Sequence, residues 1–328
     1  MNAKSNKNIR VLSGIQPSGK LHLGNYFGMM SRMINYQDKN DLFCFIVNYH
    51  ALTTTHDKKT LEQNTINAAI DFLALGLDPK KSTFWVQSDV PQVAELTWLL
   101  SNMASVGLIE RSTSYKDKIS KGLSPNMGLF SYPVLMAADI LLFGSQIVPV
   151  GKDQKQHLEI TREIAKRFNN TFGDVLVIPD EDINKDTMLI PGTDGQKMSK
   201  SYDNTIPIFC SEDELKKRVM SIVTDSAGIN EPKDKNTPLF IIYSLFLDQE
   251  KRYILEDRYN SPGLRYGDVK KELFETIIEY FAPFKKRREY LSNNLDEVHD
   301  ILISGSKKAS KVADANITKI REAMGLIY

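Results

Sequence analysis

The first half of the sequence alternates short apolar runs with longer amphipathic segments, and this alternation limits the possible folds more than any other feature. The segment from Lys59 to Leu75 repeats apolar residues at helical spacing and is followed by Gly76, a common helix stop. Four runs are β-branched or aromatic and apolar on both faces, as buried strands are: 9–13, 42–47, 83–88 and 146–150. This order predicts an α/β fold, a Rossmann-like parallel sheet with helices on both faces and ligands at the carboxyl ends of its strands.

After about Asp203 the sequence becomes charged and helical in pattern. Three amphipathic stretches follow one another: "SEDELKKRVMSIV", "TPLFIIYSLFL" and "KKELFETIIEYFAPFKKRREYL". They predict an all-helical second domain at 204–304, after a sheet-containing first domain at 1–203. The stretch from Lys307 to Leu326 reads as one more helix, and we expect 305–328 to pack back on the first domain.

Composition excludes several classes of protein. With 328 residues, 41% of them apolar, and a formal net charge of +1, the chain can bury a core but lacks the basic surface of a general nucleic-acid coat protein. Cys44 and Cys210 are too few for a four-cysteine metal site or a disulfide framework, which favours a reducing compartment. No apolar run approaches the ~20 residues of a membrane span, and the N-terminus has no signal-peptide core. We therefore expect a cytoplasmic protein with no membrane or DNA partner.

The stretch "SGKLHLGNYFG" at 18–28 follows the first predicted strand with glycines, a lysine and a histidine. Its glycines let a ligand come close, and the helix that begins here would direct free N–H groups and its positive dipole end outward, so we expect an anion here. His22, Asn25 and, at the strand end, Gln16 are further hydrogen-bond donors. The alternative is a glycine-rich turn with a surface histidine, and for an isolated His-x-Gly triplet that alternative is the better one.

A second polar stretch, "PGTDGQKMSKS" at 191–201, carries Lys197 and Lys200 in a glycine-flanked loop. We expect this loop to be mobile. Two ammonium groups on a flexible tether can close onto a triphosphate and neutralise the charge that develops on the leaving pyrophosphate. The alternative is a pair of solvated linker lysines, which are common in proteins.

Both stretches resemble signatures of the class I aminoacyl-tRNA synthetases: K-M-S-K-S at 197–201, and the His-Ile-Gly-His element at 22–25. With "SYPVLMAADILLF" and "VPVGKDQKQHLEITREIA", they make the chain similar to the bacterial-type tryptophanyl-tRNA synthetases over nearly its whole length. The resemblance implies an ATP-dependent, AMP-forming tryptophan–tRNA ligase. Such an enzyme activates L-tryptophan to tryptophanyl-adenylate, releases pyrophosphate, and transfers the tryptophanyl group to the 3′ end of tRNA(Trp).

The resemblance also implies the residues of the nucleotide site. Catalysis falls to Lys197, Lys200 and Lys118, with Mg2+ carried in by ATP and no metal site built from the protein's own residues. The ATP-binding residues are implied to be Gln16, Ser18, His22, Gly24, Asn25, Gly151, Asp153, Lys197, Met198, Ser199 and Lys200. Taken alone, Lys118 is nearly as well explained as an exposed loop charge. Asp153 is also explained as a helix cap, a role compatible with a ribose contact.

The tryptophan pocket is implied to use a helix whose i, i+4, i+7 spacing places Tyr132, Met136 and Asp139 on one face. We expect Pro133 in the first turn of this helix. By resemblance, Asp139 accepts the indole N–H, while Tyr132 and Gln154 meet the α-amino group. The alternatives are a core helix with a capped aspartate and a purely structural histidine at position 50. The implied pocket residues are Tyr132, Met136, Asp139, Val148, Val150, Gln154 and His50.

The basic segments "ELKKRVM" and "KKRREYL" of the helical domain are expected to bind the anticodon arm, although a solvated helix surface explains such charge runs by default. The resemblance further implies a homodimer with tRNA(Trp) spanning both subunits. Two other classes stay open. Met136 with Asp139 disfavours a tyrosyl-tRNA synthetase. The helical tail and the K-M-S-K-S loop disfavour a cofactor-making adenylyltransferase. A catalytically idle RNA-binding paralogue is disfavoured because Gly24, Lys197 and Lys200 are all present.

Overall fold

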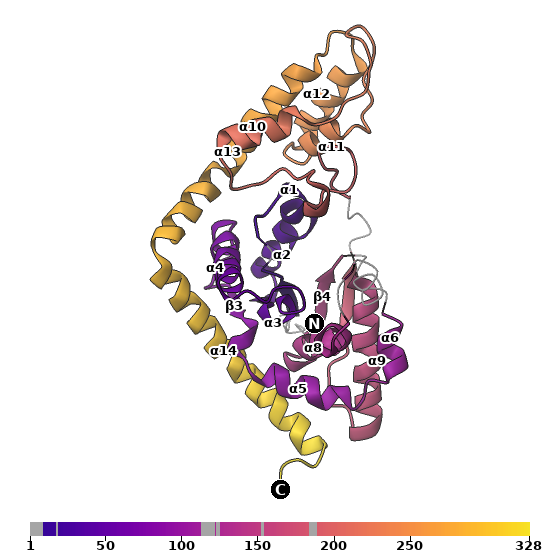
Figure 1. Cartoon of the computed structure of the whole chain (residues 1–328), viewed down its shortest axis with the longest axis vertical. Helices are drawn as coiled ribbons and strands as arrows, with labels where there is room; N and C mark the ends of the chain where they lie inside the picture. Colours follow the sequence, from indigo (N-terminus) through magenta and orange to yellow (C-terminus); the bar gives the residue numbers. More distant parts are fainter. Residues whose placement is uncertain (1–8, 18, 113–121, 123–124, 152–153, 184–188) are drawn as a thin grey trace, which may run out of the picture. The chain divides into compact units, whose positions relative to one another are not determined.

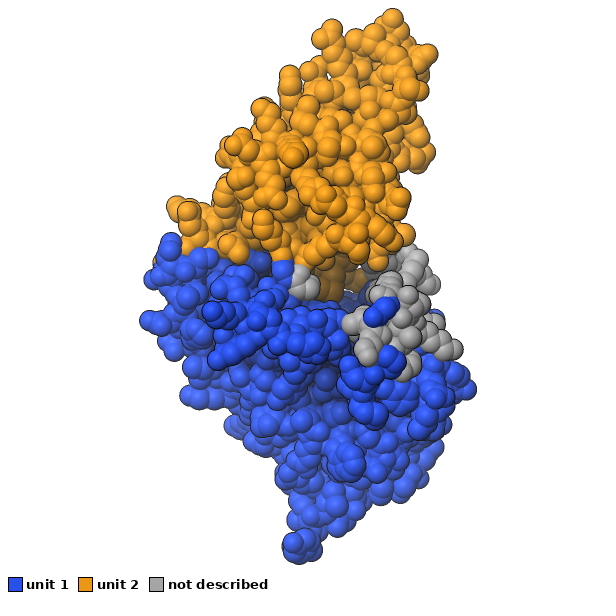
Figure 2. Space-filling view, in the orientation of Figure 1, with its two compact units in different colours: residues 1–19, 33–185, 291–328 blue, residues 20–32, 186–290 orange. Residues whose placement is uncertain are grey.

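The protein is described by a computed structural model that covers residues 9–17, 19–112, 122, 125–151, 154–183 and 189–328 (Figure 1). The chain forms two compact units (Figure 2). Unit 1 comprises residues 1–19, 33–185 and 291–328, and unit 2 comprises residues 20–32 and 186–290. Both units are therefore built from separate stretches of the sequence.

Unit 1 contains a five-stranded sheet in the order β3-β2-β1-β4-β5, and every neighbouring pair of strands is parallel. The strands are β1 (Arg10–Ile15), β2 (Asp41–Ile46), β3 (Ser82–Val86), β4 (Ile147–Val150) and β5 (Asp180–Ile183). The first four occupy the predicted runs, which confirms the parallel α/β sheet. The edge strand β5 was not predicted, because its sequence "DEDI" is charged and has none of the apolar character of a buried strand.

Helices cover both faces of this sheet, as predicted. Leu12, Phe43 and Trp85 point to one face and form a core with the helices α5, α8, α9 and α14. Neighbouring residues point to the other face, where the Cys44 and Met33 sulfur atoms lie 3.4 Å apart. The covering helices are α2 (Ser31–Asn35), α4 (Lys58–Ala74), α5 (Gln92–Ser101), α6 (Val106–Glu110), α8 (Met127–Leu142), α9 (Lys155–Phe172) and α14 (Leu295–Ala323).

Helix α14 closes the open edge of the sheet at β3 (Figure 1). It begins at Leu295, earlier than the predicted Lys307. A Cβ atom at Gly305 would overlap the backbone carbonyl of Phe84, so the helix backbone lies directly against the edge strand. The Asn316 side chain donates a 2.8 Å hydrogen bond to the Leu142 carbonyl. An edge that would otherwise expose unpaired backbone groups is thereby covered.

Unit 2 is helical, as predicted, with α10 (Glu212–Met220), α11 (Pro238–Ser244), α12 (Gln249–Asn260) and most of α13 (Tyr266–Asn293). It also includes 20–32 and 186–203, which were predicted to belong to the sheet domain. Residues 20–32 are held in unit 2 by two backbone hydrogen bonds. The Leu23 N–H donates to the Ile206 carbonyl at 3.0 Å, and the Ile208 N–H donates to the Leu21 carbonyl at 3.1 Å. Linear boundaries at 203 and 304 therefore do not coincide with the compact units.

Across the ranges given above, none of the helices combines the length and the apolar composition that a bilayer crossing demands.

Candidate functional site

The glycine corner, residues 21–25, and the lysine loop, residues 191–204, lie in direct contact within unit 2. The corner contains the short helix α1 (Leu23–Asn25), and the backbone N–H of Gly24 points at the Met198 sulfur at 3.2 Å. A Cβ atom on Gly24 would lie 3.2 Å from the Met198 Cβ and 3.0 Å from the His22 ring, both tighter than ordinary contacts. Glycine is needed here because the two motifs pack so closely.

The expectation that the first helical turn directs free N–H groups outward is wrong for Leu23 and Gly24. Their N–H groups point at the Ile206 carbonyl and the Met198 sulfur. The physical reason is that His22 and Pro207 form an antiparallel bridge, which brings the chain after the lysine loop alongside the corner. Any anion at this corner must therefore be held mainly by side chains.

The lysine loop has a fixed internal frame with its two cations on the outside. Lys197 and Lys200 are exposed, whereas Met198 between them is buried. The buried Asn204 side chain donates to Asp194 Oδ1 at 2.8 Å and to the Lys197 carbonyl at 3.0 Å, and accepts from the Ser199 N–H at 2.8 Å. Asn204 thus ties both arms of the loop together, a role that sequence reasoning missed.

His22 is a buried, uncharged imidazole. Its Nδ1 atom has no hydrogen-bond partner among the described residues. Burial, assisted by the nearby Lys200 ammonium, lowers the pKa of His22 to about 4. The ring is therefore neutral at physiological pH, and it lies close to a lysine that remains exposed.

In unit 1, predicted pocket residues meet at the carboxyl ends of the strands. Asp139 on α8 is 3% exposed, and its carboxylate accepts hydrogen bonds from Gln87 Nε2 at 2.8 and 2.9 Å. His50 Nε2 lies 2.8 Å from the same carboxylate. Burial raises the pKa of Asp139, and the bonds from His50 and Gln87 oppose that rise. His50, on α3 (Asn48–Ala51) after β2, and Gln87, directly after β3, thus bring two strand ends to one carboxylate.

A second hydrogen-bonded group joins α8 to the start of α9. The Tyr132 hydroxyl lies 2.7 Å from His157 Nε2, and His157 Nδ1 lies 2.9 Å from Gln154 Oε1. The rings of Tyr132 and His50 meet edge to face at 6.3 Å. Tyr132, His50, Asp139 and Gln154, four of the predicted pocket residues, are therefore brought together. The sequence did not indicate His157 or Gln87, because neither the residue type nor the spacing shows that a side chain will be a buried hydrogen-bond partner of a pocket residue.

Helix α8 begins earlier than predicted. Its first residue is Met127, and the Asn126 side chain caps it by accepting the Leu129 N–H at 2.8 Å. Pro133 therefore lies inside the helix, and the expectation that it occupies the first turn is wrong. Met136 packs at the margin of the core. After β1, Gln16 is exposed.

Three other predicted residues lie around β4 and its carboxyl end. Val148 is buried in the core, and Val150 packs against it. Beyond the strand, the Gly151 carbonyl accepts the Gln154 N–H at 2.9 Å. Three predicted site residues lie outside the described residues: Ser18, Lys118 and Asp153. The described ranges contain no group of three or more His, Cys, Asp and Glu side chains placed to share a metal ion.

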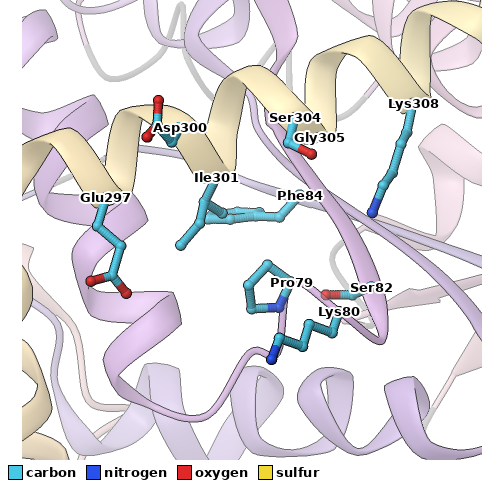
Figure 3. Close-up of a pocket in the computed structure, with 10 residues that line it drawn as sticks. All are labelled: Pro79, Lys80, Ser82, Phe84, Glu297, Asp300, Ile301, Ser304, Gly305 and Lys308. Carbon is cyan, nitrogen blue, oxygen red and sulfur yellow. The ribbon is translucent and has the colours of Figure 1, made fainter.

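A groove of about 560 Å³ lies elsewhere in unit 1, between α14 and the beginning of β3 (Figure 3). Figure 3 shows Pro79, Phe84 and Ile301 at its centre, with Lys80 and Lys308 beside them. It adjoins the amino end of a parallel strand, whereas ligands of such sheets bind at the carboxyl ends. We therefore assign a candidate amino-acid pocket to the strand ends of unit 1 and a candidate nucleotide site to the corner and lysine loop of unit 2.

Comparisons with known proteins point in one direction. A sequence model described as tRNA synthetases class I (W and Y) matches residues 4–282. The chain is 52% identical over 319 residues to a tryptophan–tRNA ligase of Fusobacterium nucleatum, with 97% of this chain and 98% of that protein covered. Its structure resembles that of Campylobacter jejuni tryptophanyl-tRNA synthetase complexed with ADP and tryptophan, at a TM-score of 0.91 and 50% identity over 97% of this chain and 100% of the other. It also resembles the structure of Mycoplasma pneumoniae tryptophanyl-tRNA synthetase, at a TM-score of 0.85 and 31% identity. That comparison covers 97% of this chain and 98% of the other.

Proposed function

Since the chain belongs to the class I tRNA synthetases for tryptophan and tyrosine, among which it is a tryptophan–tRNA ligase, we propose that its strand ends bind tryptophan while its corner and lysine loop bind ATP. The contact between Gly24 and Met198 carries the second half of this proposal, because it unites the two phosphate-binding motifs in one unit. The Campylobacter jejuni relative, complexed with ADP and tryptophan, supports both halves.

The tryptophan pocket holds the amino acid at two points. Asp139 accepts the indole N–H. Hydrogen bonds from Gln87 and His50 fix the orientation of the Asp139 carboxylate and stabilise it in its buried position. Tyr132 and Gln154 receive the α-ammonium group, while Met136, Val148 and Val150 form the walls. A pocket built around one buried acceptor rejects a ring that lacks the donor by roughly 10^4- to 10^5-fold, so phenylalanine is a very poor substrate.

Activation needs no side-chain nucleophile. The tryptophan carboxylate attacks the α-phosphorus of ATP, the bond to pyrophosphate breaks, and Lys197 and Lys200 neutralise the charge on that leaving group. Mg2+ bound to the phosphates adds to this neutralisation. His22, Gly24, Asn25, Met198 and Ser199 form the wall behind the phosphates. The remaining proposed nucleotide contacts are Gln16, Ser18, Gly151, Asp153 and Lys118.

A hydroxyl at the 3′ end of tRNA(Trp) then attacks the carbonyl of tryptophanyl-adenylate, so that the tryptophanyl ester forms, the bond to phosphate breaks and AMP leaves. The helical unit binds the anticodon arm, which we place on the basic faces of α10 and α13, in a cytoplasmic enzyme. The enzyme is a homodimer, and unit 1 offers an apolar surface for the second copy. Trp98 and Met127 are 70% and 74% exposed. They adjoin Thr97 and Asn126, which line a hollow of about 500 Å³ bounded by α5, α8 and the segment from α3 to His56. Such exposed apolar surface is typical of an interface.

Tryptophan-dependent exchange of labelled pyrophosphate into ATP tests this function. We expect Lys200→Ala to slow the exchange about 10^2- to 10^3-fold, as loss of one charge-stabilising group typically does, and to leave tryptophan binding nearly unchanged. Lys217→Ala, an exposed lysine on α10, is the matched control. An unchanged exchange rate in Lys200→Ala would refute the role of the lysine loop. Exchange with tyrosine in place of tryptophan would refute the substrate assignment.

A further inference from the structure

We propose that His157 is a positioning residue, which sets the Tyr132 hydroxyl and the Gln154 carbonyl oxygen as acceptors for the α-ammonium group of tryptophan. This inference rests on the proposed function, because it concerns how the pocket recognises its amino acid. His157 lies in the first turn of α9, is 1% exposed, and contacts both of the other side chains.

The two hydrogen bonds of His157 determine where its proton lies. Gln154 Oε1 carries no hydrogen, so the 2.9 Å bond to it requires that His157 Nδ1 is the donor. Burial favours the uncharged ring, which has one N–H only. Nε2 therefore carries a lone pair, and the 2.7 Å bond to the Tyr132 hydroxyl must be donated by the tyrosine.

This proton arrangement sets the polarity of the two side chains that face the substrate. Because the Tyr132 proton is directed at His157, any further group meets the Tyr132 oxygen only as a donor. The Gln154 carbonyl oxygen can likewise accept a second hydrogen bond, because it has two lone pairs and the bond from His157 uses only one. Both polarities suit an ammonium group, which has three N–H donors and no acceptor. A ring that donated from Nε2 would instead free the Tyr132 proton to point at the substrate cation.

The geometry gives His157 this task without contact to the reacting atoms. Gln154 is the residue before the first turn of α9, and Tyr132 lies on α8, so their backbones belong to different helices. One imidazole joins both side chains and fixes the distance between them. The positioning of two acceptors for one cation thus depends on a residue that itself need not touch it.

The test compares two ligands that differ only in the ammonium group. We expect His157→Phe to weaken tryptophan binding about 10- to 100-fold, the range for loss of hydrogen bonds to a charged group. Binding of indole-3-propionate, which keeps the ring and the carboxylate but lacks the ammonium group, should change less than about 3-fold. Tyr132→Phe should show the same pattern, and the double variant should lose little more than either single one. His299→Phe, an exposed histidine on α14, is the control.

Conservative variants guard against simple misfolding. His157→Gln keeps an acceptor for the Tyr132 hydroxyl, and His157→Asn keeps a donor for Gln154, so each should restore part of the tryptophan affinity. Equal losses for both ligands in His157→Phe, or no loss for either, would overturn the inference. Failure of the proposed function looks different: the unmodified protein would then show neither tryptophan binding nor tryptophan-dependent exchange.

Discussion

At the scale of single residues, His22 links the nucleotide corner to the stability of unit 2. Its ring is buried beside Gly24, and burial, assisted by the nearby Lys200, lowers its pKa from 6.5 to about 4. Between these two pH values the unfolded chain binds a proton that the folded chain does not. The free energy of unfolding therefore falls as the pH drops from about 6.5 toward 4.

We expect this contribution to be absent from His22→Gln. In the unmodified protein, up to about 3 kcal/mol of the free energy of unfolding is lost between pH 7 and pH 4 through this one group. Urea unfolding followed by far-UV circular dichroism at several pH values measures the difference between the two proteins. His56→Gln, an exposed histidine, should keep the full pH dependence. Identical pH curves for the unmodified protein and His22→Gln would contradict the buried neutral ring.

The residues that sequence reasoning found and missed differ in one physical respect. Lys197, Lys200 and Gly24 belong to short contiguous motifs, which the sequence displays directly. Gln87 and His157 act through partners 52 and 25 residues away, and neither has a motif around it. A hydrogen bond of that kind exists only once the helices and strand ends have packed, so no local pattern predicts it.

At the scale of secondary-structure elements, the contact between α14 and β3 depends on one missing side chain. Gly305 lies where a Cβ atom would overlap the Phe84 carbonyl. The predicted helix began only at Lys307, two residues after this glycine, whereas α14 begins at Leu295. Strands β1 to β4 were predictable because they are apolar on both faces. The start of α14 was not, because tertiary packing overrides its local sequence.

Gly305→Ala should therefore destabilise unit 1. The added methyl group forces α14 away from the edge strand, and overpacking of this kind costs about 1–3 kcal/mol in the free energy of unfolding. Urea unfolding followed by tryptophan fluorescence reports on it, since both Trp85 and Trp98 lie in unit 1. Lys307→Ala, at an exposed position on the same helix, is the control. If the Gly305→Ala variant were as stable as the unmodified protein, the prediction would be contradicted, because α14 would then have room to shift away from β3.

At the scale of the whole molecule, the exposed apolar surface around Trp98 is the feature that an isolated chain leaves unexplained. Trp98→Lys should convert a dimer to a monomer, because it places a charge at the centre of the proposed interface. Sedimentation velocity across a range of concentrations measures the mass. Tyr253→Lys on α12, equally exposed at 72%, should leave the mass unchanged. A monomeric unmodified protein would contradict the proposed assembly.

The order in which the units appear along the chain also bears on how the protein is made. Strand β3 is translated early, yet its open edge is covered by residues 295–323. Throughout synthesis of residues 87–294, a nascent chain carries a sheet whose border is bare and able to pair with other polypeptides. The edge of β3 can therefore be covered only after the whole helical unit has been synthesised, because α14 follows that unit in the sequence.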